Sequence, residues 1–232
     1  MKVCVLGLEG VPLGKHNLKD SRLDQADKLV EAKKKTYAQV DVVGLEAVMD
    51  ADSIVATPGA LADLILADLE FIETRLGRQP TEAEAAALRK VQAHLEGEGT
   101  VFSAGLAAEE TQALTAHAFR TARPVVVAQA GAESPEGLML RAFRESGHFC
   151  FLTVGGKENR AWPIRAGTTA WEAAGAIHSD LQKGFIRAEV IGFADFLEAG
   201  GEVQAKRAGK LRLETKPYVV QDYDVVNFRF NK

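Results

Sequence analysis

The most informative part of this sequence is the run Gly184-Phe185-Ile186-Arg187-Ala188-Glu189-Val190-Ile191. Arg187 and Glu189 alternate with apolar neighbours, so a β-strand would place the charged pair on one face of a sheet. Upstream, Thr168 or Thr169 is a good N-cap for a helix that runs to about Lys183, and Gly184 is suited to end it. The stretch therefore predicts a helix followed directly by a half-buried strand.

More strands are predicted on both sides of this one. Two precede the helix, with a Gly155-Gly156 turn between them, and two follow residue 191, the last broken at 222–224. Their predicted ranges are 149–154, 160–164, 210–214 and 218–230. A helix packed across a mixed sheet of this size is a β-grasp, or ubiquitin-like, arrangement.

The first half of the chain has another pattern. Short apolar runs at 2–6, 39–43, 53–56 and 124–128 predict buried strands, and glycine or proline follows several of them. Between the last two runs, Ile65, Leu69, Ile72 and Leu76 are spaced like a heptad seam, and Pro80 opens a second helix. A third helical stretch is predicted over 106–123. We expect an antiparallel helical hairpin inserted into an α/β core.

Several motifs resemble one known family. Glu158-Asn159-Arg160-Ala161-Trp162, Ala174-Gly175-Ala176-Ile177-His178 and the run 66–76 are similar to segments of the YchF (Obg-like) ATPases, a family of P-loop proteins. The likeness extends over nearly the whole chain and is most specific after residue 150. It implies an α/β protein in three parts. These are a truncated P-loop-like parallel core (1–58 and 123–147), the helical hairpin (59–122) and a C-terminal β-grasp TGS domain (148–232).

The nucleotide site that this resemblance implies is incomplete. A P-loop needs Gly-x4-Gly-Lys-Ser/Thr, but here Glu9 stands where the first glycine belongs and His16 replaces the hydroxyl residue. An imidazole is a poor ligand for Mg²⁺, and the catalytic part of switch II is missing. We predict no catalytic or metal-binding residue. The remnant nucleotide-binding set is Gly10, Gly14, Lys15, Asp41, Gly44 and Gln129.

Three interpretations of the loop at 7–15 stay open. It can be an ordinary Gly-rich turn, a weak anion site built on Lys15, or a site that still binds ATP or GTP. No cofactor is firmly predicted, and Mg²⁺ is disfavoured because His16 lacks the hydroxyl oxygen. Phosphoryl transfer needs positioning and Mg²⁺ together, so we expect a protein that does not hydrolyse nucleotide.

Basic residues of the C-terminal third form the second candidate site. TGS domains resemble RNA-associated or ribosome-associated modules, and a partly basic sheet face can contact phosphates. The alternative is solvated charge beside nearby glutamates. The candidate RNA-binding or partner-binding residues are Lys183, Arg187, Lys206, Arg207, Lys210, Arg212 and Arg229.

Composition limits the other classes of function. The chain has 28 Lys and Arg against 32 Asp and Glu, which argues against a general polyanion binder, and no apolar run approaches the length of a membrane span. Cys4 and Cys150 lie in apolar runs and are predicted to be buried and reduced, and Lys33-Lys34-Lys35 is interpreted as a solvated face. We expect a cytoplasmic protein, no membrane contact and no reading of DNA sequence.

Three functions follow as hypotheses. The first is a non-catalytic, YchF-like protein that binds the ribosome or structured RNA. The second is a nucleotide-dependent switch with slow or no hydrolysis. The third is a protein-interaction scaffold.

Overall fold

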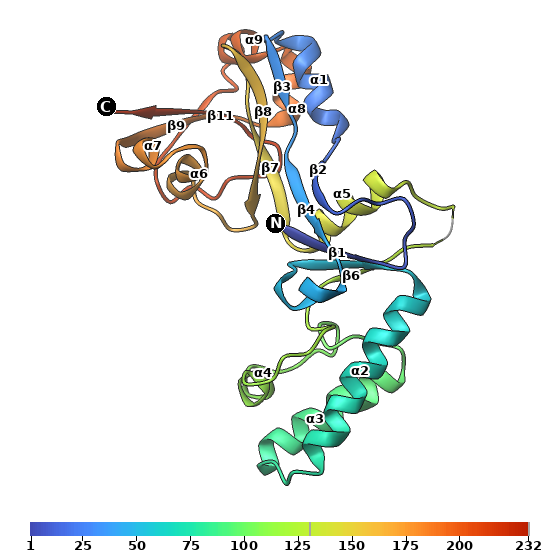
Figure 1. Ribbon diagram of the computed structural model, residues 1–232. Helices are drawn as coiled ribbons and strands as arrows, with labels where there is room; N and C mark the ends of the chain where they lie inside the picture. Colours follow the sequence, from blue (N-terminus) through green and yellow to red (C-terminus); the bar gives the residue numbers. More distant parts are fainter. Residues whose placement is uncertain (130, 232) are drawn as a thin grey trace. The chain divides into compact units, whose positions relative to one another are not determined.

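The computed structural model describes residues 1–129 and 131–231, and the chain forms two compact units (Figure 1). Unit 1 consists of residues 1–16 and 40–146, and unit 2 of residues 17–39 and 147–232. The chain thus leaves unit 1 early, contributes a segment to unit 2 and returns. Among the described residues, no helix has the length and apolar character needed to cross a bilayer.

Unit 1 is built on a five-stranded sheet. The strands are β1 (Lys2–Leu6), β2 (Gly14–Asn17), β4 (Gln39–Val43), β5 (Ser53–Ala56) and β6 (Val125–Val127), in the order β2-β4-β1-β5-β6. β1 runs parallel to both β4 and β5, and β5 runs parallel to β6. A short 3-10 helix, Leu45–Asp50, joins β4 to β5, and α5 (Pro135–Glu145) follows β6.

The centre of this sheet is covered on both faces. All four residues of β5 are buried, as expected for a short apolar strand inside a parallel sheet. Cys4, Ile54 and Leu64 share one cluster of buried side chains. Cys4 is a free thiol, and burial raises its pKa to about 11, which keeps it protonated and inert.

Two long helices extend from the sheet as the predicted hairpin. α2 (Pro58–Leu76) and α3 (Glu82–Glu96) are N-capped by the hydroxyls of Thr57 and Thr81. Ile65 and Ile72 of the predicted seam are buried against Leu88, Val91 and Leu95, and Leu69 and Leu76 pack at the edge of the same cluster. The apolar spacing thus fixes how the two helices pack (Figure 1).

The third helical stretch is shorter than the sequence predicts. α4 covers only Ala108–Leu114, and the backbone beyond it is not helical up to β6. The buried carboxylate of Asp68 explains the difference, because it accepts hydrogen bonds from the backbone N–H groups of Arg120 and Thr121 and from the Thr121 hydroxyl, at 2.7–2.9 Å. A helical segment could not offer these N–H groups to a side chain of α2.

Unit 2 contains a six-stranded mixed sheet in the order β10-β9-β11-β7-β8-β3. Its strands are β3 (Lys34–Thr36), β7 (His148–Thr153), β8 (Glu158–Arg165), β9 (Phe185–Ile191), β10 (Arg212–Glu214) and β11 (Val225–Phe230). β9 is antiparallel to β10 and β11, β7 is antiparallel to β8, and β11 is parallel to β7. Residues 185–191 therefore form the predicted strand, and it lies inside this sheet.

One face of this sheet packs against α6 (Ala170–Ile177). Ala170, Ala173 and Ala174 are fully buried and allow the helix to approach Phe151 and Phe228 closely. The helix predicted up to Lys183 is interrupted at His178, whose extended backbone caps a separate α7 (Ser179–Lys183). Two further helices, α8 (Phe193–Ala199) and α9 (Glu202–Arg207), fill the stretch between β9 and β10, where the sequence reading predicted none.

The segment 17–39 is part of unit 2, whereas the sequence-based boundaries place it in the N-terminal core. It contains α1 (Ser21–Leu29), which contacts β8 and α8, and β3, which pairs in parallel with β8. Leu23 and Ala26 of α1 are fully buried. The prediction follows chain order, but the fold brings together segments more than a hundred residues apart.

Candidate functional site

Four parallel strands of unit 1 end at one edge of their sheet. The residues just beyond β1, β4 and β5 are Gly7, Gly44 and Thr57, and Gln129 follows β6 after one residue. Ligands of open α/β sheets bind at the carboxyl ends of such strands. Of the predicted nucleotide-binding residues, the fold brings Gly44 and Gln129 to this edge.

The loop after β1 passes close to the start of α2. Gly7 has a φ of +73°, and a Cβ built there would lie 2.2 Å from Oγ1 of Thr57. Only glycine tolerates both that conformation and that approach. Gly7 therefore serves the packing of the loop against the cap of α2.

The other predicted nucleotide-binding residues lie in the loop after β1 or within strands of the sheet. Gly14 and Lys15 lie in β2, the outermost strand next to β4, and Gly10 lies in the loop before it. Asp41 is within β4, where its backbone N–H donates to the carbonyl of Met1. A P-loop instead places its Gly-Lys pair where the loop enters a helix, so that backbone N–H groups converge on phosphate. These residues do not have that arrangement.

The side chain of His16 contacts its own loop. Its Nε2 lies 2.6 Å from the carbonyl oxygen of Pro12. Near Gln129, Glu133 forms an ion pair of 2.8 Å with Arg141, whose Nη2 also donates to the carbonyl of Val127. The Glu133 carboxylate is therefore paired with an arginine.

Three of the seven predicted basic residues of unit 2 are engaged with acidic partners. Arg229 donates two hydrogen bonds of 2.9–3.0 Å to Glu189 and lowers the pKa of that carboxyl. Lys210 pairs with Asp195 at 2.9 Å, and Arg212 contacts Glu214 and the Tyr218 hydroxyl. These three side chains are paired within the unit and offer little charge to a ligand.

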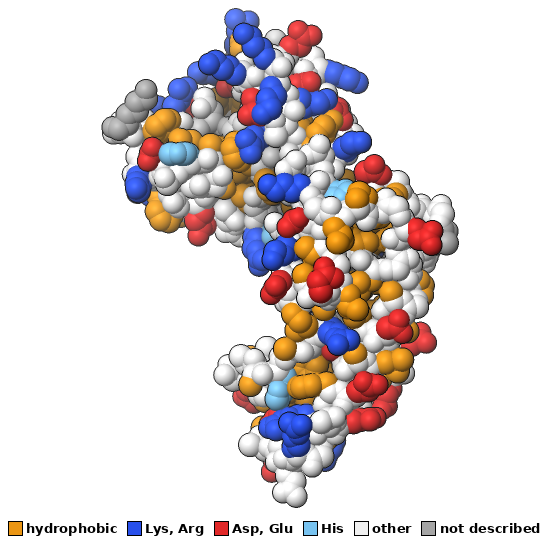
Figure 2. Space-filling view, in the orientation of Figure 1, with side chains coloured by type: hydrophobic (Ala, Val, Ile, Leu, Met, Phe, Trp, Pro, Cys, Tyr) orange, Lys and Arg blue, Asp and Glu red, His pale blue; other side chains and the backbone are white. Residues whose placement is uncertain are grey.

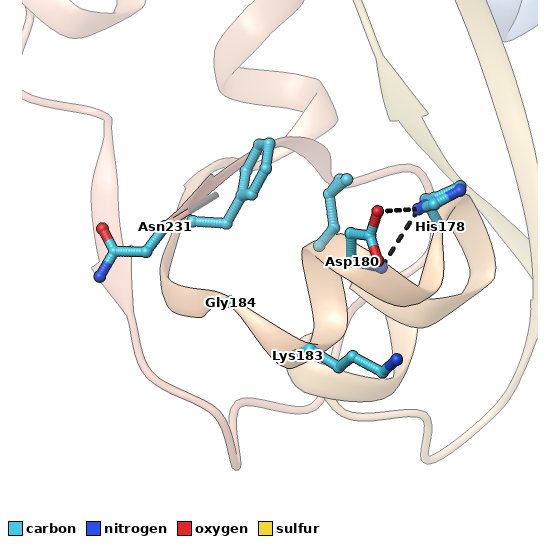
Figure 3. A pocket seen from close by; sticks show the side chains of 7 residues that line it. His178, Asp180, Lys183, Gly184 and Asn231 are labelled. Atoms are coloured by element: carbon cyan, nitrogen blue, oxygen red, sulfur yellow. Dashed lines mark hydrogen bonds and ion pairs between the residues drawn. The ribbon is translucent and has the colours of Figure 1, made fainter.

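The remaining four, Lys183, Arg187, Lys206 and Arg207, are exposed and form no salt bridge within the described residues. Figure 3 shows Lys183 at a pocket with His178, Asp180 and Asn231, where His178 and Asp180 bond each other. The pocket measures about 720 Å³, and Leu181 and Phe230 give it an apolar lining. Arg187 and Lys206 lie close enough to Glu189 to help lower its pKa.

Sequence reasoning missed the contribution of residues 17–39 to this unit. Lys34 and Lys35 pair with Glu158 and Asp24 at 2.9 and 2.6 Å, while Lys33 is exposed and forms no salt bridge with the described residues. The feature visible in the sequence is the run of three lysines at 33–35, and this run alone does not reveal that β3 pairs with β8. The parallel pairing of β3 with β8 places this run beside residues 158–160 of unit 2.

Comparison with known proteins agrees with this picture. The family YchF-GTPase_C, described as a protein of unknown function (DUF933), matches residues 149–231. The "Ribosome-binding ATPase YchF" of Haemophilus influenzae is 34% identical over 232 residues, covering 73% of this chain and 64% of that protein. The protein of the same name from Haemophilus ducreyi is 58% identical over 81 residues, which are 35% of this chain and 22% of the relative.

A solved structure shares the fold. The Schizosaccharomyces pombe YchF GTPase superposes with a TM-score of 0.74 at 18% identity, covering 99% of this chain and 97% of that one. The α/β fold class expected from the sequence is thereby confirmed. The matched region spans less than two thirds of the length of each of these two curated relatives. With the C-terminal family match and the likeness along the chain, these findings show that the protein belongs to the YchF family.

Proposed function

We propose that this chain is a ribosome-associated protein that binds RNA through unit 2 and does not hydrolyse nucleotide. The observation that carries the proposal is the placement of Gly14 and Lys15 within strand β2, where a P-loop would have them at the start of a helix. The relatives' name, ribosome-binding ATPase, supports the ribosome as partner. Ribosomes work in the cytoplasm, which is the location that we propose.

Unit 2 is the binding module in this proposal. We assign residues 148–232 to a TGS domain of the β-grasp type, because α6 packs across a mixed sheet as such a fold requires. Lys183, Arg187, Lys206 and Arg207 are the side chains that remain available to phosphates after the internal ion pairs are formed. Charge-assisted hydrogen bonds from such groups carry most non-specific RNA affinity.

The loss of hydrolysis follows from the geometry of the first loop. Phosphoryl transfer depends on a cradle of N–H groups, a lysine that reaches the β- and γ-phosphates, and Mg²⁺ held by a hydroxyl. Lys15 extends from an edge strand and His16 bonds the Pro12 carbonyl, so neither is positioned for its part.

A direct test combines ribosome sedimentation with calorimetry. We expect the full chain to cosediment with ribosomes at low salt and to be released as salt rises. We expect no heat of ATP or GTP binding at millimolar nucleotide, with or without Mg²⁺, and no difference for Lys15→Ala. Micromolar binding that Lys15→Ala abolishes would contradict the non-catalytic part, and the absence of sedimentation at low salt would contradict the ribosomal part.

One observation favours a second candidate, a nucleotide-binding switch. Gly7, Gly44, Thr57 and Gln129 still stand beyond the carboxyl ends of four parallel strands, the place where nucleotides bind in such sheets. A purine nucleotide held there without Lys15 would bind in the calorimeter and would be insensitive to Lys15→Ala. That pattern separates this candidate from a P-loop that still works and from a chain that binds no nucleotide.

A further inference from the structure

Charge is divided unevenly between the two units. Unit 2 has 18 Lys and Arg against 14 Asp and Glu, an excess of four positive charges, and unit 1 has 10 against 18, an excess of eight negative charges. Residues 17–39 alone contribute six basic and four acidic residues to unit 2. The segment that joins from the N-terminal half therefore supplies half of the positive excess.

Not all of these cations are available to a ligand. Lys34, Lys35 and Arg160 have carboxylate partners within 4 Å inside the unit. Lys33 and Lys157 are exposed and form no salt bridge among the described residues, and the same is true of Lys206 and Arg207. We call Lys33, Lys157, Lys206 and Arg207 the basic rim.

The fold places Lys33 next to Lys157. The parallel register pairs Lys34 with Glu158 and Lys35 with Asn159, so the preceding residues, Lys33 and Lys157, lie side by side where both strands begin. Neither side chain has an acidic partner among the described residues. Residues 124 positions apart in sequence thus form a pair of free cations at one end of the sheet.

The same end of the unit receives α9. The Val30 side chain, just after α1, lies within 4 Å of the positions that a Cβ would take at Gly155, in the turn before β8, and at Gly201, just before α9. α9 then carries Lys206 and Arg207 in its last turn. Figure 2 shows Lys and Arg side chains gathered over the end of unit 2 where α9 and β3 lie.

From this arrangement we propose that the basic rim binds the phosphate backbone of structured RNA. The inference rests on the proposed function and names the surface that performs it. Four unpaired cations on three separate segments match a ligand that carries a negative charge at every unit of its length. The four rim side chains contact phosphates and not base edges in this proposal, so binding through them should show no sequence preference.

The test uses the full chain and a fluorescein-labelled RNA hairpin of 20 base pairs, with anisotropy read between 50 and 200 mM KCl. The variant is Lys33→Ala with Lys157→Ala. The matched control is Lys19→Ala with Lys216→Ala, which removes two exposed lysines, one before α1 and one near the start of α6. Within the part of the chain that the structure describes, these two also form no salt bridge. Thermal melts check that both variants fold, as expected for exposed side chains without partners.

We expect the rim variant to bind about tenfold more weakly at 50 mM KCl, and its plot of log K against log salt to be shallower by roughly 1.5–2, since each phosphate contact contributes about 0.9 to the slope on a duplex. The control should bind as tightly as the unmodified chain.

If the unmodified chain binds and the rim variant binds equally well, the inference is wrong while the proposed function stands. If the amount of chain that cosediments with ribosomes changes neither with salt nor with loss of the rim lysines, the partner is a protein and the inference is overturned. If the unmodified chain binds neither hairpin nor ribosome, the proposed function itself fails.

Discussion

Asn159 is a single residue that holds three segments of unit 2 together. Its side chain is fully buried. Its Oδ1 accepts from the N–H of Gly155 at 2.9 Å, and its Nδ2 donates to Asp27 at 2.7 Å and to the carbonyl of Val30 at 2.5 Å. The amide thus ties the end of α1 to the turn between β7 and β8, the same end at which the basic rim lies.

We predict that Asn159→Ala lowers the free energy of unfolding of unit 2 by about 2–4 kcal/mol, because it removes three hydrogen bonds that the fully buried amide makes with partly buried groups of Gly155, Asp27 and Val30. Urea unfolding followed by far-UV circular dichroism measures the change. Asn227→Ala, which removes an exposed amide from β11, is the control and should cost less than 1 kcal/mol. Equal effects of the two substitutions would show that the amide network contributes nothing.

Single residues also show which contacts could not be predicted from the sequence. Asn159 stood inside a recognised motif, but nothing in the motif says that its partners are Asp27 and Val30, more than 125 residues earlier. Lys15 is the opposite case, because its neighbours Gly14 and His16 suggested a damaged phosphate loop, and the backbone there forms a strand. A local pattern predicts local structure well, and it does not predict which distant segment completes a hydrogen-bond network.

At the scale of elements, the helical hairpin depends on one buried acidic side chain. Glu84 in the first turn of α3 accepts from Arg75 of α2 at 2.5 and 3.0 Å, and its Oε1 lies 2.7 Å from Nε2 of His117. Only 8% of Glu84 is exposed. The hydrogen bonds from Arg75, and to a lesser degree those from His117, lower the pKa of Glu84 from 4.5 to about 2.

The sign of the pH dependence follows from this direction. Because the pKa of Glu84 is lower in the folded chain than in the unfolded chain, its ionised form stabilises the hairpin fully above about pH 4.5. That contribution is lost as the pH falls from 4.5 toward 2. We predict that Glu84→Gln destabilises the chain clearly at pH 6 and much less at pH 3.

Thermal melts of the unmodified chain and of Glu84→Gln at pH 6 and pH 3 measure how the destabilisation changes with pH. All other carboxyl groups titrate in both proteins, so their contribution cancels in this comparison. Glu82→Gln is the control, since Glu82 lies in the same turn, is exposed and has no ion pair among the described residues. A Glu84→Gln effect of the same size at pH 6 and pH 3 would contradict the assignment.

Elements with strong local signals were predicted well. The strand at 185–191, the seam of α2 and the cap at Thr169 agree with the structure because alternation, heptad spacing and a capping box are encoded within a few residues. The helices α8 and α9 were missed, since each has only six or seven residues and their glycine-rich ends suggested a loop. Short helices of this kind are stabilised by tertiary packing, here the buried Phe196 and Ala205, more than by propensity.

At the scale of the whole molecule, the two units are interleaved along the chain. Residues 17–39 leave unit 1 and supply unit 2 with a buried helix face and an edge strand. Arg22 of this segment lies 3.5 Å from the ring centre of Tyr223 and donates to Asp222 at 2.6 Å. The region matched by the C-terminal family begins only at residue 149, so it lacks a part of the unit that it belongs to.

We therefore predict that residues 147–232 expressed alone fold poorly, because the surface that Leu23 and Ala26 cover in the full chain would be exposed to water. A synthetic peptide of residues 17–39 should bind this fragment and raise its melting temperature in proportion to the logarithm of peptide concentration. The same peptide with Leu23→Asp is the control and should have no effect, since a carboxylate cannot replace a fully buried leucine without a large penalty.

The contrary result would be a fragment that melts cooperatively alone, at the temperature of unit 2 in the full chain, and that the peptide does not affect. It would show that residues 17–39 contribute nothing to the stability of unit 2. Because Lys33 lies on that peptide, the complex should also bind the RNA hairpin more tightly than the fragment alone, which joins the stability of the unit to the surface that we propose for its ligand.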